Sequence, residues 1–231
     1  MATGFDHSFD PARKLVVVGD ASAQKTALLL AFVKERYDPH EYLPTVFQSR
    51  VEDVEVVNQA GKKRDVQLAL WEVTGQSDYD KELSYRDTDV ILVCFSVKDQ
   101  DSFENVQYKW IPEIKVYCPD VPFLIVGHQT DLEDDTKPLG EPERRRRLRG
   151  RVPAEDARWL AKQVGAVAYM ECCARSRKRV KKVFHAAALA SLQEAKKRQS
   201  SKCKKKHADF MFHNDHFHHG NIIQNGFYMS C

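Results

Sequence analysis

The chain has 231 residues, of which 42% are hydrophobic and 30% charged, and its formal net charge is +3. Such values are typical of a soluble globular protein with one sizeable core, and the charge alone indicates no partner. No apolar stretch approaches the roughly 20 residues of a membrane span. Residues 1–14 lack the apolar core of a signal peptide. The six cysteines show no CxxC pairing, which predicts reduced thiols in the cytosol.

Apolar runs and turn residues predict strands that alternate with helices along the chain. The predicted strands are 14–19, 51–57, 64–71, 90–96, 123–127 and 168–171, with the second and third forming a hairpin, and the helices are 25–34, 102–115, 153–164 and 178–197. This alternation indicates an α/β protein of three layers with a mostly parallel sheet. Ligands of such sheets bind beyond the carboxyl ends of the strands, so we expect the site at that edge.

The first predicted strand is followed by a lysine and a threonine that open a helix. Gly19, Lys25 and Thr26 match the GxxxxGK[ST] phosphate loop, whereas Gln24 stands where the pattern has glycine. In such a loop, backbone N–H groups cradle phosphate oxygens, the lysine reaches the β and γ phosphates, and the threonine hydroxyl ligates Mg²⁺. A Lys-Thr pair at the start of a helix is common, so this match needs further motifs to support it.

Further motifs follow in register: YLPTVF at 42–47, LWEVTGQ at 70–76, SY at 84–85, GHQTDL at 127–132 and ECCAR at 171–175. With them the chain resembles the Rho family of small GTPases over about 14–206, with local similarity to the GTPase-deficient Rnd branch. The resemblance implies a Ras-like P-loop NTPase fold with a six-stranded, mostly parallel sheet, one antiparallel strand and a Rho-type helical insert at about 133–152. It also implies a flexible N-terminus at 1–12, a GTPase domain at 13–198, and a basic, then disordered tail at 199–231.

The resemblance further implies which residues form the site. GTP or GDP would be bound by Gly19, Asp20, Ala21, Ser22, Ala23, Gln24, Lys25, Thr26, Ala27, Tyr37, Thr45, Gly75, His128, Gln129, Asp131, Cys173, Ala174 and Arg175. Mg²⁺ would be held by Thr26 and Thr45, and by Glu72 through a water molecule. Gln76 would position the attacking water, and Asp131 would accept hydrogen bonds from the guanine ring.

Five departures from the family pattern weaken the expectation of efficient hydrolysis. Ala21 and Thr74 add atoms beside the γ-phosphate, and Gln24 replaces the glycine of the phosphate loop. Glu72 is one methylene longer than the family's aspartate, and Gln129 replaces a lysine that packs along the base. The segment 76–84 is also two residues shorter than in the family.

Two hypotheses about function therefore stand. In the first, the protein is a signalling switch that binds GTP with Mg²⁺, hydrolyses it slowly and engages effectors in cytoskeletal or other small-GTPase pathways. In the second, it is a pseudo-GTPase: an interaction module with the fold and little or no nucleotide binding. The sequence leaves enzymatic activity undecided between them.

Partner proteins are expected at switch I, about 42–47, and at the shortened switch II, about 74–85. The basic tail predicts a weak contact with anionic membrane, since neither Cys203 nor Cys231 forms a Cys-a-a-X box. The expected location is the cytoplasm, with a peripheral contact at the plasma membrane as an alternative. Nucleic acid is not expected, because no aromatic residues interleave the basic runs. For the histidines of the tail, a disordered segment is favoured over a metal site.

Overall fold

The computed structural model describes residues 11–35, 38, 44, 47–57, 61, 63–73, 78–129 and 150–192. The chain divides into two units, Met1–Leu192 and Gln193–Cys231, and every described residue belongs to the first. The helical insert predicted at about 133–152 lies almost wholly outside the described residues. So do the predicted tail and all but the last two residues of the N-terminal segment 1–12.

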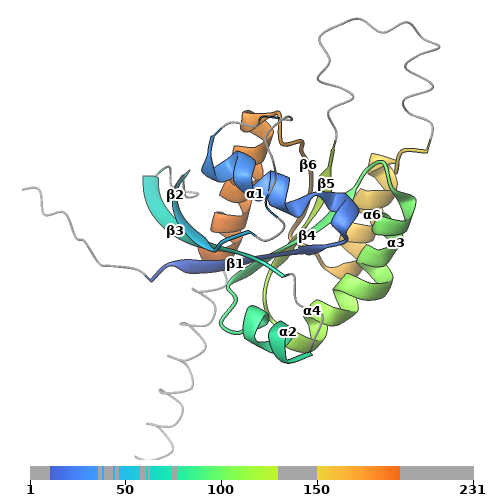
Figure 1. Cartoon of the computed structure of the whole chain (residues 1–231), viewed down its shortest axis with the longest axis horizontal. Helices are drawn as coiled ribbons and strands as arrows, with labels where there is room; N and C mark the ends of the chain where they lie inside the picture. The colour runs from blue at the N-terminus through green and yellow to red at the C-terminus, as the bar shows by residue number, and fades with distance from the viewer. Residues whose placement is uncertain are drawn as a thin grey trace, which may run out of the picture. The chain divides into compact units, whose positions relative to one another are not determined.

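A six-stranded sheet forms the middle layer, in the order β2-β3-β1-β4-β5-β6 (Figure 1). Its strands are β1 (Arg13–Gly19), β2 (Arg50–Val57), β3 (Lys63–Glu72), β4 (Val90–Ser96), β5 (Phe123–His128) and β6 (Ala168–Glu171). β2 pairs with β3 antiparallel, and all other pairs are parallel. This confirms the predicted mixed sheet with one antiparallel strand.

Helices cover both faces of the sheet, which gives three layers (Figure 1). On one face, α1 (Lys25–Val33) and the helical segment 177–192 pack on a core that includes Leu15 and Val17 of β1. On the other face, α6 (Ala154–Val164) and the helices near it pack on Val16 and Val18. Because β1 is buried on both faces, its sequence is a continuous apolar run rather than an alternating one.

The long helical segment after β4 is interrupted. It consists of α3 (Gln100–Asn105), a π-helical turn η2 (Val106–Trp110) and α4 (Ile111–Tyr117). The amide of Ile111 donates to the carbonyl of Val106, five residues earlier. The sequence predicted one regular helix over 102–115, so that prediction was right about the helix and wrong about its regularity.

A short helix, α2 (Asp78–Tyr85), lies in the predicted switch II and was not predicted from the sequence. Its last residue, Tyr85, is buried, stacks on Tyr117 of α4 with ring centroids 5.2 Å apart, and donates its hydroxyl to Glu113 at 2.7 Å. The other oxygen of that carboxylate accepts from Lys81 Nζ at 2.8 Å. The α2 helix is therefore fastened to α4.

Two predictions drawn from composition can be compared with the described residues. Within them, no helix combines the length and the apolar character needed to cross a bilayer. The four cysteines described there are buried and form no disulfide with one another: Cys94, Cys118, Cys172 and Cys173. The reduced state of the six thiols stays a prediction.

Candidate functional site

The predicted phosphate loop connects β1 to α1 at the carboxyl edge of the sheet. A 3₁₀ turn, η1 (Ala21–Ala23), fills most of the connection, with Ala21 and Ser22 exposed and Ala23 buried. Ala27 lies in the first turn of α1 and is also buried. The loop therefore presents backbone and the N-terminus of a helix to solvent, as phosphate binding requires.

Gly19 closes β1 against β4 and has no room for a side chain. It lies opposite Cys94 in the parallel pair, and its φ is +140°. A Cβ atom added there would lie 2.1 Å from the carbonyl oxygen of Cys94. The glycine of the motif is thus required here for close packing between two central strands.

Gln24 holds the position at which the phosphate-loop pattern has its second glycine. Its backbone is left-handed, with φ 51° and ψ 48°, and it is the N-cap residue of α1. This conformation costs an L-residue about 1–2 kcal/mol. The sequence showed that Gln24 replaces the glycine of the pattern, and the structure shows backbone strain at the same residue.

We predict that Gln24→Gly raises the free energy of unfolding by about 0.5–1 kcal/mol, because glycine adopts positive φ without strain. Urea unfolding would measure the change. The matched control is Gln163→Gly on the exposed face of α6, which should lower stability by about 1 kcal/mol. Equal destabilisation by both changes would contradict the strain.

Lys25, Thr26 and Glu72 meet at the start of α1. Lys25 is buried and donates to the carbonyls of Gly19 at 2.8 Å and Asp20 at 3.3 Å. Thr26 Oγ1 donates to the Glu72 carboxylate, whose oxygens lie 3.1 and 2.9 Å away, and Lys25 Nζ is 3.8 Å from Oε1 of Glu72. Burial raises the pKa of the Glu72 carboxyl above its usual value, although the Thr26 bond and the Lys25 charge oppose this shift.

These three residues suit a Mg²⁺ ion accompanied by phosphate. Thr26 uses its proton on Glu72, so the lone pairs of its oxygen stay available to a cation, and Glu72 supplies an adjacent negative charge. Mg²⁺ is commonly bound in this way, by one or two protein groups together with phosphate oxygens. The carboxylate of Glu72 accepts its hydrogen bond from Thr26 directly, and the predicted contact of Glu72 with Mg²⁺ through a water stays a prediction.

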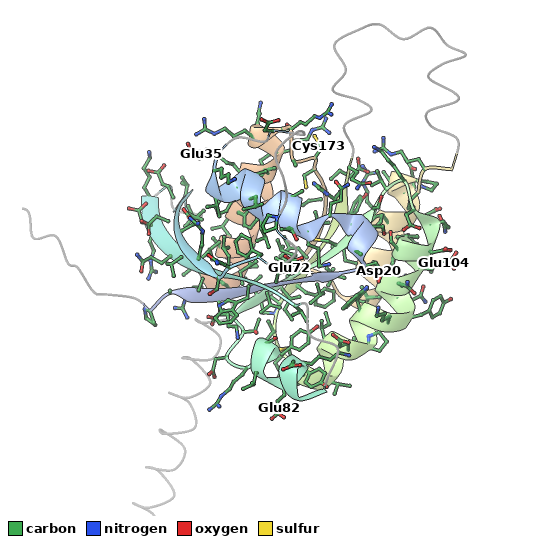
Figure 2. All side chains as sticks on the ribbon, in the orientation of Figure 1. Asp20, Glu35, Glu72, Glu82, Glu104 and Cys173 are labelled. Carbon is green, nitrogen blue, oxygen red and sulfur yellow. The ribbon has the colours of Figure 1, made fainter. Side chains whose placement is uncertain are left out.

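Asp20, labelled in Figure 2, connects the phosphate loop to the π-helical turn. Its carboxylate accepts from Asn105 Nδ2 at 2.6 Å and from Trp110 Nε1 at 3.0 Å, and Lys109 Nζ lies 3.5 Å from Oδ1. In a regular helix, residues five apart point about 140° away from each other. The i→i+5 hydrogen bonding of the π-helical turn brings Asn105 and Trp110 to the same side of the helix, where both contact Asp20.

We predict that Trp110→Phe lowers the free energy of unfolding by about 2 kcal/mol, because it removes a hydrogen bond to a charged, partly buried carboxylate. Chemical denaturation would measure the loss. Tyr108→Phe serves as the control, since Tyr108 lies in the same turn, is 73% exposed and should change stability by less than about 0.5 kcal/mol. Similar stability of both variants would exclude an energetic role for the indole bond.

The loop after β5 is braced against the phosphate loop by two side chains. His128 Nδ1 lies 2.9 Å from the carbonyl oxygen of Ala23, which can only accept, so this nitrogen carries a proton. Gln129 Nε2 donates to the carbonyl of Ser22 at 3.1 Å, and Gln129 Oε1 accepts from Ser96 Oγ at 2.7 Å. Gln129 thus connects the loop to both the phosphate loop and β4.

The loop after β6 lies beside the same edge. The amide of Cys172 donates to the carbonyl of Gly127 at 2.9 Å, which joins the ends of β5 and β6. Cys173 and Ala174 are buried and Arg175 is exposed. The structure therefore places residues 128–129 and 173–175 at the ends of neighbouring strands, and their predicted contact with the base stays a prediction.

Several predicted site residues lie outside the described part of the chain: Tyr37, Thr45, Thr74, Gly75, Gln76 and Asp131. Their roles stay predictions. Conversely, the sequence did not indicate Ser96, Asn105 or Trp110. Ser96 could have been found, because it ends a buried strand at the ligand edge. The other two had no signal, because their role depends on the π-turn.

A family model described as "Ras family" matches residues 14–193, which is most of the chain. The matched part contains the sheet, the phosphate loop with Lys25 and Thr26, and the loops after β5 and β6. Members of this family are small GTPases, which bind GTP or GDP with Mg²⁺ and engage effectors and regulators in signalling. The chain belongs to the Ras family of small GTPases.

Proposed function

We propose that this protein is a Rho-type GTP-binding signalling protein that engages effectors in cytoskeletal or small-GTPase pathways and hydrolyses GTP slowly. One observation supports nucleotide binding above all others: Lys25, Thr26 and Glu72 converge at the N-terminus of α1. The Rho branch is supported by the YLPTVF motif at 42–47 and by the place of the insert.

Each of these residues would have a different role in binding a nucleotide. Lys25, which donates to two loop carbonyls, would redirect its ammonium group to the β and γ phosphates. Thr26 and Glu72 would hold Mg²⁺, which neutralises charge on the phosphate oxygens. Asp20, fixed by the π-turn, would keep the loop backbone in place while the phosphates bind.

The base would be read at the loops after β5 and β6. His128 and Gln129 brace the first of these loops on the phosphate loop, so the two ends of a nucleotide would be held at a fixed separation. Asp131 follows them and would accept from the guanine N1–H and the exocyclic amine. Adenine offers no matching pair of donors, so we propose guanine selectivity.

The decisive experiment is to denature the purified protein and identify any released nucleotide by chromatography. We expect GDP or GTP, and we expect unlabelled GTP, not ATP, to displace a labelled guanine nucleotide. Asp131→Ala should abolish this preference, whereas Asp156→Ala on α6 should not. Equal displacement by ATP and GTP would contradict guanine selectivity.

A pseudo-GTPase remains the second candidate, and specific observations favour it. Gln24 strains the phosphate loop, and Glu72 and Gln129 stand where the family pattern has an aspartate and a lysine. If each departure weakened binding by about 1 kcal/mol, three would reduce affinity about a hundredfold. Absence of nucleotide from the purified protein, together with no measurable GTP binding in Mg²⁺, would establish this alternative.

Regulators and effectors would bind at the switch segments, 42–47 and 74–85. We propose that the protein is cytoplasmic and makes a peripheral contact with anionic membrane through the basic residues 196–206. Sedimentation with anionic vesicles should then fall as salt rises above physiological strength, where the Debye length is about 8 Å. Binding that persists at high salt would contradict a purely electrostatic contact.

A further inference from the structure

Glu72 is one methylene longer than the aspartate that the Rho resemblance implies at this position. It is the last residue of β3, it lies opposite Val17 of β1, and its side chain is only 5% exposed. From there it reaches across the sheet edge to the first turn of α1. Both of its carboxylate oxygens are within hydrogen-bond distance of Thr26 Oγ1.

The hydrogen-bond distance between these oxygens is also compatible with two adjacent ligands of one magnesium ion. Mg²⁺ binds six oxygens at 2.0–2.1 Å in an octahedron, so two adjacent ligand oxygens lie about 2.9 Å apart. Thr26 Oγ1 and Glu72 Oε2 lie 2.9 Å apart. A cation ligated by the threonine would therefore have the glutamate oxygen within direct bonding reach.

The charge around Glu72 also favours a direct bond. Lys25 Nζ is 3.8 Å from Oε1 and donates its hydrogen bonds to the carbonyls of Gly19 and Asp20. The buried carboxylate is therefore held by one neutral hydroxyl and a cation that lies beyond hydrogen-bond distance. Direct ligation of a divalent ion would compensate for the cost of burying this charge.

We propose that Glu72 is a direct ligand of the cation that accompanies the bound nucleotide, in place of a carboxylate that acts through a water. This inference rests on the proposed nucleotide binding. In this proposal, the additional methylene of glutamate lets the carboxylate reach the cation without an intervening water. The metal site of this chain thus has one water fewer than the family pattern implies.

The test counts the water molecules on the cation. The full-length protein is loaded with GDP and Mn²⁺, and the broadening of the Mn²⁺ EPR lines in ¹⁷O-enriched water gives the number of bound waters. We expect Glu72→Asp to carry one more bound water than the unaltered protein. Glu55→Asp is the matched control, because Glu55 lies on the same hairpin, is 56% exposed and should leave the count unchanged.

A second measurement concerns affinity. The Mn²⁺ concentration that half-maximally slows release of a fluorescent GDP should rise about tenfold or more in Glu72→Asp and stay constant in Glu55→Asp. Bound nucleotide with the same water count in the unaltered protein and in Glu72→Asp would overturn this inference alone. Failure of the unaltered protein to hold any guanine nucleotide in Mn²⁺ or Mg²⁺ would overturn the proposed function and this inference with it.

Discussion

Replacement of Gly19 by alanine is expected to lower the free energy of unfolding by about 3 kcal/mol or more. The new Cβ would lie 2.1 Å from the Cys94 carbonyl oxygen, a distance that no side-chain rotation can relieve because the obstacle is backbone. β1 and β4 would have to separate at the centre of the sheet, directly before the phosphate loop. Urea unfolding would measure the loss, and soluble expression would fall with it.

A control separates the steric cost from the conformational one. Gly165 ends α6 with φ 80°, and no atom lies within 4 Å of a Cβ added there. Gly165→Ala should therefore cost only about 1 kcal/mol, the usual penalty for a left-handed L-residue. If both substitutions cost the same, the contact between Gly19 and Cys94 would not be the cause.

GTP hydrolysis is expected to be about a hundredfold slower than in a small GTPase with an intact site, and a Rho-type activating protein should stimulate it little. An arginine finger supplied by such a partner is worth about 10³–10⁵ in rate, and it requires free space beside the γ-phosphate. Ala21 is exposed at the start of the loop and adds a methyl group there, and a misplacement of about 1 Å can cost a hundredfold. Single-turnover hydrolysis, with and without the partner, would measure both rates.

Ala21→Gly should raise the hydrolysis rate, and Ala21→Gly with Thr74→Ala should raise it further. Ser22→Gly is the control, because it gives the adjacent exposed residue the same backbone freedom without removing the methyl group at position 21. Strong stimulation of the unaltered protein by the activating partner would contradict the prediction. An unchanged rate in the double variant would point to Gln24 or Glu72 as the cause.

The sheet was predictable because its signals are local. The run from Val90 to Ser96 is buried throughout, so its sequence is almost continuously apolar. In β2 and β3, apolar and polar residues alternate because one face of each strand is buried and the other is exposed. The α2 helix gave no such signal: its Leu83 is half exposed, and it is held chiefly by the bonds of Tyr85 and Lys81 to α4. Helical periodicity is weak where a polar network replaces an apolar stripe.

The candidate site was predictable from its motifs but not in its contacts. Asn105 and Trp110 reach Asp20 across 85 and 90 residues of sequence, and only the π-turn aligns them. The hydrogen bond from Thr26 to Glu72 depends on the register between β1 and β3, and no local sequence pattern specifies that register. Residue types therefore indicated which chain segments to compare, and the tertiary fold determined which atoms meet.

The π-helical turn η2 changes the direction in which all later side chains of the same helical segment point. Each residue of an α-helix advances the side chains by about 100°. Deleting one residue from η2 would restore a regular helix and rotate Glu113 away from Tyr85, while Asn105 kept its place beside Asp20. One extra residue thus sets the directions in which this helical segment contacts the phosphate loop, through Asp20, and α2, through Tyr85.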